Sequence, residues 1–167
     1  FYFICWFGNK IIFVFLILNS LGTNKIASKG ASLLFNALKE YKPNITLVYL
    51  NNNQLDDNCM KSLSEFIQTN QTIKDINIDS NKITDKGIEI LLPYLIGNTT
   101  IKYLGISSNI GITDKSIPLL KEIIQKSNIQ DVNINGTLII NGEKEIISSL
   151  SIPIDKREIP LITIGNV

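Results

Sequence analysis

The sequence predicts an α/β fold in which short parallel strands alternate with helices. The first observation is an internal period of about 28 residues, which links Asn53, Asn81, Asn109 and Thr137. The second is a strand-like alternation of apolar residues just before each of these positions. The third is a helix-like apolar stripe just after it. Because every unit contains a strand followed by a helix, successive strands run parallel.

A frame of apolar residues defines the strand half of each unit. These residues stand eight, five and three positions before the repeated Asn or Thr, and one more follows two or three positions after it. All sixteen positions, four in each of four units, are apolar in a chain that is 44% apolar, which excludes coincidence. We therefore expect adjacent parallel strands at residues 45–50, 73–78, 101–106 and 129–134. The frame consists of Ile45, Val48, Leu50 and Leu55; Ile73, Ile76, Ile78 and Ile83; Ile101, Leu104, Ile106 and Ile112; and Ile129, Val132, Ile134 and Ile139.

A stripe of apolar or small residues, spaced by four, defines the helix half of each unit. This spacing places them on one face of a helix. We expect helices at residues 58–69, 86–96, 115–126 and 142–150, with an earlier helix near 29–40. The stripes consist of Gly30, Leu34 and Leu38; Cys59, Leu63 and Ile67; Gly87, Leu91 and Leu95; Ser116, Leu120 and Ile124; and Gly142, Ile146 and Leu150.

Two sets of repeated polar residues fit structural roles. The repeated Asn follows each strand, where its amide can satisfy backbone groups of neighbouring units. Asp56 and Asp57, with Asp85 and Asp114 at equivalent places, stand at the starts of predicted helices, where carboxylates cap a helix and complement its dipole. We expect both sets to stabilise the fold rather than to bind a ligand or catalyse a reaction.

These patterns resemble the leucine-rich repeats of the ribonuclease-inhibitor-like class. The resemblance is carried by the apolar frame, by the small residues that begin the stripes, and by segments such as "NQTIKDINIDSNKITDKGIEILL" and "NTTIKYLGISSNIGITDKSIPLL". It covers residues 23–150. It implies an α/β leucine-rich repeat solenoid shaped as a horseshoe, with about 28 residues per repeat. In that class the parallel strands line the concave face and the helices form the convex face.

The two ends of the chain fit the repeat less well. Residues 1–22 form an apolar N-terminal segment, for which three interpretations stay open: a damaged or truncated repeat, a signal or anchor sequence, or a stretch that is not native coding sequence. Residues 151–167 are expected to form a C-terminal cap or tail, in which Ile159, Ile162 and Ile164 make a last strand. Because the chain begins at Phe1, we also expect it to be part of a longer product.

Composition argues against an enzyme, a metal site and a cofactor site. The chain has no His, and its formal charge of +1 lacks the basic footprint of a nucleic-acid-binding domain. It contains no glycine-rich phosphate loop and no nucleophile elbow. Its two Cys, at 5 and 59, are too few for a disulfide framework, and Cys59 falls on a helix packing position. We expect no enzymatic activity, no metal and no cofactor.

The concave strand face is the candidate functional site. Residues that alternate with the buried ones form a mildly acidic, Asn-rich surface with two tyrosines and no Lys or Arg. A solvated surface without a ligand is one interpretation, and a protein-binding face is the other. A dent at Gly105, beside the two tyrosines, is expected to receive a protruding side chain. The predicted protein-binding residues are Tyr49, Asn51, Asp75, Asn77, Asp79, Tyr103, Asp131 and Asn133.

The leading functional hypothesis is a non-catalytic, cytoplasmic scaffold that binds another protein, one with a basic patch. The resemblance implies roles such as enzyme inhibition, ligand sensing or cytoskeletal regulation. It also allows two alternatives, a GTPase-activating protein of the Ran type and a secreted or membrane receptor ectodomain. Four N-glycosylation sequons, at Asn44, Asn70, Asn98 and Asn135, barely favour secretion because two of them are one repeat apart. No nucleic acid is expected, and no membrane unless residues 1–18 are a signal or anchor.

Overall fold

The computed structural model describes residues 6–7, 10–11, 21–42, 44–142, 146 and 150. Near the N-terminus the described backbone forms two short antiparallel strands, β1 (Trp6–Phe7) and β2 (Lys10–Ile11). Leu21, which is buried, and Gly22 are also described; the expectations for the rest of residues 1–22 and for residues 151–167 fall outside the described residues. None of the helices in the described part of the chain is long and apolar enough to cross a membrane.

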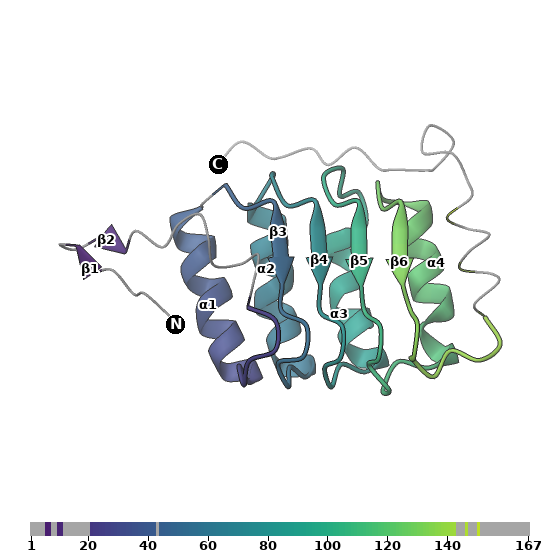
Figure 1. Cartoon of the computed structure of the whole chain (residues 1–167). Coiled ribbons are helices and arrows are strands. Elements are labelled where there is room, and N and C mark those ends of the chain that lie inside the picture. The colour runs from purple at the N-terminus through teal and green to yellow at the C-terminus, as the bar shows by residue number, and fades with distance from the viewer. Residues whose placement is uncertain are drawn as a thin grey trace.

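Strands and helices alternate along the rest of the chain, and the strands form one parallel sheet in the order β3-β4-β5-β6. The helices lie side by side on one face of that sheet (Figure 1). The elements are α1 (Ser28–Tyr41), β3 (Leu47–Tyr49), the 3-10 turn η2 (Asp57–Cys59), α2 (Met60–Thr69), β4 (Asp75–Asn77), α3 (Asp85–Leu95), β5 (Tyr103–Gly105), the 3-10 turn η3 (Asp114–Ser116), α4 (Ile117–Gln125) and β6 (Asp131–Asn133).

This arrangement confirms the predicted alternation of helices with parallel strands. The strands lie inside the predicted ranges, and α1 to α4, with the 3-10 turns that precede two of them, begin and end close to the predicted positions. Of the helix expected at residues 142–150, the structure describes Gly142, which is not helical, and Ile146 and Leu150, which are.

The register of the sheet follows the spacing of the sequence. Leu47 pairs with Asp75, Asp75 with Tyr103, and Tyr103 with Asp131, so partners in neighbouring strands are one repeat period apart in the sequence. Two positions further along, a second row joins Tyr49, Asn77, Gly105 and Asn133. Equivalent residues therefore stand in columns across the four strands.

The core lies between the sheet and the helices. Fifteen of the sixteen frame residues are buried, and Ile45 is partly buried against the same cluster. The helical stripes are buried as well, with a difference in α1. There Ser28, Ala31, Phe35 and Leu38 are buried, whereas Gly30 is exposed and Leu34 is only partly buried, so of the predicted stripe only Leu38 is buried. The rings of Phe35 and Phe66 stack with their centroids 6.0 Å apart, which fixes this face of α1.

The repeated asparagines connect the units through their side chains. Asn81 is the fullest example: its Oδ1 accepts hydrogen bonds from the N–H groups of Asn53 and Leu55, each at 2.9 Å. Its Nδ2 donates to the carbonyls of Leu50 at 3.0 Å and Ile78 at 2.9 Å. Asn53 and Asn109 make equivalent bonds to the unit before them. The structure therefore confirms the structural role predicted for the repeated asparagines. Their amides satisfy buried backbone groups that the turn would otherwise leave unpaired.

Thr137 replaces this amide only in part. Its hydroxyl donates to the carbonyl of Ile134 at 2.8 Å and accepts weakly from Ile139 N–H at 3.4 Å, both within its own unit. A hydroxyl is too short to reach the carbonyl of the preceding unit. The bonds that the repeated amides make between units therefore end at Asn109, and Thr137 does not continue them.

Two of the sequons hold the loops between a helix and the next strand. Asn98 is 9% exposed, and its Oδ1 accepts hydrogen bonds from Thr100 N–H at 3.0 Å and Ile101 N–H at 2.8 Å. Asn70, 5% exposed, makes the same turn with Thr72 and Ile73. The Asn-x-Thr pattern at these two positions thus has a local structural cause, since Asn side chains readily replace backbone acceptors in turns.

Candidate functional site: the helix-free face of the sheet

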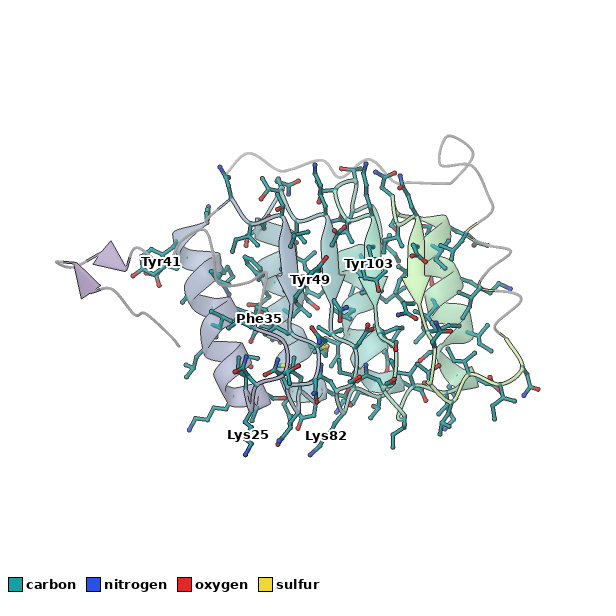
Figure 2. The ribbon with its side chains drawn as sticks, viewed as in Figure 1. Lys25, Phe35, Tyr41, Tyr49, Lys82 and Tyr103 are labelled. Atoms are coloured by element: carbon teal, nitrogen blue, oxygen red, sulfur yellow. The ribbon has the colours of Figure 1, made fainter. Side chains whose placement is uncertain are left out.

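The face of the sheet opposite the helices collects the polar side chains of the strands and of the residues just after them. We call it the helix-free face, and Figure 2 shows Tyr49 and Tyr103 on its strands. All eight predicted site residues lie on it, and none of its residues is Lys or Arg. The face consists of Leu47, Tyr49, Asn51, Asp75, Asn77, Asp79, Tyr103, Gly105, Ser107, Asp131, Asn133 and Asn135.

The first column of this face alternates acids with an aromatic ring. Tyr103 pairs with Asp75 on one side and with Asp131 on the other. Neighbouring strands are about 4.8 Å apart, so the two carboxylates flank the ring about 10 Å from each other. That separation is too great for shared coordination of one metal ion, whose oxygen ligands lie within about 2.6 Å of it. It suits two cationic groups of a partner placed on either side of an aromatic contact.

The expected dent at Gly105 is filled by the protein itself. A Cβ atom added to Gly105 would lie 2.9 Å from Asp79 Oδ1 and 3.0 Å from the hydroxyl of Tyr103. The ring of Tyr103 therefore leans along its own strand over the glycine, toward Asp79. The prediction that this dent receives a partner's side chain is wrong, because Gly105 makes room for Tyr103 and Asp79 instead.

Asp79 is held in place at the centre of the face. Its Oδ1 accepts a hydrogen bond from Ser107 N–H at 2.6 Å, and its own N–H donates to Asn77 Oδ1 at 3.0 Å. Burial raises the pKa of the Asp79 carboxyl above its ordinary value, although the bonds from Ser107 and Asn77 oppose the shift. Burial also raises the pKa of Tyr103, and the nearby charges of Asp79 and Asp131 add to that effect. A cation brought close to Asp79 would relieve this unfavourable desolvation.

A shallow hollow of about 260 Å³ opens at the β6 end of the face. Its lining is mixed, since the apolar Val132, Ile134 and Ile146 line it together with Tyr103, Asp131, Asn133 and Asn135. Its volume is below the range of typical small-molecule pockets. Such a hollow can receive one side chain of a protein partner, and Asp131, Asn133 and Asn135 offer that side chain polar partners.

The aspartates at the helix starts, Asp56, Asp57, Asp85 and Asp114, are engaged in bonds between units. Asp85 Oδ1 accepts from Thr113 N–H at 2.8 Å and from the hydroxyl of Ser116 at 2.6 Å, while Oδ2 accepts from the hydroxyl of Thr113 at 2.7 Å. Asp56, Asp57 and Asp114 make similar bonds to Ser28, Thr84 and Asn141. The hydroxyls of Thr84 and Thr113 cap the helix starts of α3 and η3, and they donate in turn to Asp57 and Asp85. Asp56 caps η2 directly, since its side chain accepts from Asn58 N–H.

These bonds predict that the fold loses stability in acid. Burial opposes ionisation of Asp85, yet hydrogen bonds from Ser116 and Thr113 outweigh it and lower its pKa; bonds from Ser28 and Asn141 lower the pKa of Asp56 and Asp114. Because unfolded carboxyls titrate near 3.8, the unfolded chain takes up these protons first, and stability falls as pH drops below that value toward the lower folded pKa values. Asp79 acts in the opposite direction, since its folded pKa is raised.

Urea unfolding at about pH 7 and about pH 3 measures this effect, and we expect the lower midpoint at the acidic pH. Asp85→Asn is the matched variant. It should be less stable than the native chain at neutral pH and should lose less on acidification. A native midpoint that stays constant or rises between these pH values would show that the inter-unit carboxylates do not carry the pH dependence.

The described residues contain no arrangement suited to catalysis or metal binding. No group of three or more Cys, Asp or Glu among them could hold a metal ion. Burial raises the pKa of the Cys59 thiol to about 11, so it stays protonated and unreactive at neutral pH.

Comparison with known proteins agrees with the architecture. Residues 69–91 match the leucine-rich repeat family. No curated protein matches the chain in sequence. Among solved structures, leiomodin-1 actin-binding site 2 is similar with a TM-score of 0.64 and 20% sequence identity, over 78% of this chain and 75% of that chain. At that identity the likeness concerns the fold. The chain therefore has a leucine-rich repeat fold, as the sequence predicts.

Proposed function

We propose that this chain is a non-catalytic scaffold that binds another protein on its helix-free face. In this proposal the array is a horseshoe of the ribonuclease-inhibitor-like class with about 28 residues per repeat, and the helix-free face is its concave side. The proposed location is the cytoplasm. The observation that carries the proposal is the register of the sheet, which places Asp75, Tyr103 and Asp131 in one column on a face without Lys or Arg.

The chemistry of this face favours a partner with a basic patch. Three aspartates, Asp75, Asp79 and Asp131, face the partner, and Asp79 is already partly desolvated. Tyr residues are frequent anchors at interfaces because they bury a large area at low entropic cost. Lys or Arg side chains of the partner would lie on either side of Tyr103, with one side chain in the hollow lined by Asp131 and Asn135.

The name of the similar solved structure suggests the first partner to test. That protein segment is described as an actin-binding site, and the present chain shares its fold. Co-sedimentation with filamentous actin is therefore the first assay. Affinity capture followed by mass spectrometry would provide candidates if actin does not bind.

Substitutions on the helix-free face test the proposed site once a partner is in hand. Tyr103→Ala and Asp131→Lys are each expected to weaken binding by about 2 kcal/mol, roughly 30-fold in Kd, since they remove an anchor or reverse a contacting charge. Isothermal titration calorimetry measures the change, and circular dichroism checks that the fold is retained. Asp131 is exposed, so its substitution leaves the core intact.

Lys121→Glu on α4 is the matched control, because it reverses a charge beside a hollow of about 560 Å³ that α4 and its C-cap residue line. The proposed site requires that this variant bind as the native chain does. If Lys121→Glu weakens binding while Tyr103→Ala and Asp131→Lys do not, the partner binds the helices and the proposal is wrong.

A further inference from the structure

Two Asn-Gly dipeptides lie close together in the sequence, at Asn135–Gly136 and Asn141–Gly142. In such a dipeptide the backbone nitrogen of Gly can attack the amide carbon in the side chain of Asn, because Gly has no Cβ to block the approach. A new C–N bond forms, the original C–N bond of that amide breaks, and the proton of the Gly nitrogen leaves with ammonia. Water then opens the cyclic imide and yields Asp or isoaspartate, so no oxidant or other reactant is needed.

The structure leaves the first of these dipeptides open to reaction. Asn135 and Gly136 are both exposed in the turn after β6, and Gly136 has a φ of 71°. The backbone of Asn135 is held by Asn133 Oδ1 and by Ser108 N–H. Within the described part of the chain, however, no hydrogen bond holds the side-chain amide of Asn135 or the N–H of Gly136. Both reacting groups can therefore sample the close approach that ring closure needs.

The second dipeptide is restrained on both sides of the reacting bond. Asp114 accepts hydrogen bonds from the backbone N–H of Asn141 at 3.1 Å and from its Nδ2 at 2.7 Å. Gly142 is buried, and its Cα lies so close to Ile117 that an added Cβ would overlap that side chain. The amide carbon of Asn141 is thus fixed toward Asp114, while the backbone of Gly142 has little room to rotate.

We infer that Asn135 is a site of spontaneous deamidation in the folded protein and that Asn141, in the same dipeptide context, is protected by Asp114. The reaction exchanges a neutral amide for a carboxylate in the hollow that Tyr103 and Asp131 also line. It therefore adds negative charge slowly and irreversibly to the helix-free face. The effect of that charge on a basic partner rests on the proposed function; the reaction itself does not.

Peptide mapping by mass spectrometry tests the reaction on the full chain, after incubation of the folded protein at mildly alkaline pH. Asn135 should convert to Asp and isoaspartate at least about tenfold faster than Asn141, a rate ratio that corresponds to about 1.4 kcal/mol in barrier. In concentrated urea the two should convert at similar rates, since the local sequences then decide. Equal rates in the folded protein, or faster conversion of Asn141, would overturn the inference.

Two variants separate the cause from the consequence. Asp114→Ala removes the restraint, so Asn141 should then approach the rate of Asn135 while the protein remains folded by circular dichroism; an unchanged Asn141 rate would overturn the protective role of Asp114. Asn135→Asp mimics the product and should bind a basic partner more tightly than Asn135→Gln does. If Asn135 deamidates as expected but these two variants bind alike, the modification stands and its link to the proposed binding face fails.

Discussion

Replacing Asn81 by Ala is expected to lower the free energy of unfolding by about 3–5 kcal/mol. The side chain is 7% exposed and makes five hydrogen bonds to the backbone, two as acceptor and three as donor. Alanine leaves the N–H groups of Asn53 and Leu55 without this acceptor in the interior, where an unpaired polar group costs about 1–3 kcal/mol. Such a loss is a large fraction of the roughly 5–15 kcal/mol that stabilises a typical domain.

Urea denaturation followed by far-ultraviolet circular dichroism measures this loss. Asn36→Ala is the matched control, because Asn36 is exposed on α1 and its replacement should change stability by less than about 0.5 kcal/mol. A loss below about 1 kcal/mol for Asn81→Ala would mean that water or backbone movement replaces the amide, and that the asparagines are not what joins the units.

Phe66→Ala is expected to cost about 3–5 kcal/mol for a different reason. Phe66 lies on α2 with no exposed surface, and its ring stacks on Phe35 of α1 at an interplanar angle of 18°. Truncation removes the aromatic contact and leaves a cavity between the two helices. Since α1 contacts the rest of the array chiefly through α2 and η2, this cavity lies where the first unit is attached.

Hydrogen exchange resolves where the loss occurs, and urea denaturation gives its size. The amides of α1 should exchange faster in Phe66→Ala than those of α4, because the weakened contact is local to the first units. Leu33→Ala provides the comparison: Leu33 is 65% exposed on α1, so removing it opens no cavity. If both variants have the stability of the native chain, the stacked pair does not anchor α1.

The sequence alone determined the fold of this protein and which residues make up its candidate site. A strand shows its side chains alternately on two faces, so the frame residues Val48, Ile76 and Leu104 had to share the buried face. The residues that alternate with these frame residues, such as Tyr49 and Asp75, then had to lie on the opposite face of the sheet. A constant spacing also fixed which of them become neighbours, because parallel strands of a repeat pair at equivalent positions.

The tertiary structure decided how those side chains are used. A sequence places Gly105 on a face but cannot say whether the space above it is open; the ring of Tyr103, two residues away on the same strand, fills it. Likewise, helical spacing allowed α1 to bury Gly30 and Leu34, whereas in the structure Ala31 and Phe35 are buried and the ring of Phe35 stacks on Phe66. Both outcomes depend on the shape and size of side chains brought together by folding, which a pattern of polar and apolar residues does not record.

The same distinction separates the two Asn-Gly dipeptides. In the sequence Asn135 and Asn141 are equivalent, each followed by Gly and six residues apart. Only the folded chain brings Asp114 to Asn141 and leaves Asn135 in an open turn. The period of the sequence shows which residues every unit must repeat in order to stack. The contact between Asp114 and Asn141, 27 positions apart, decides which of the two Asn-Gly dipeptides is restrained and which can react.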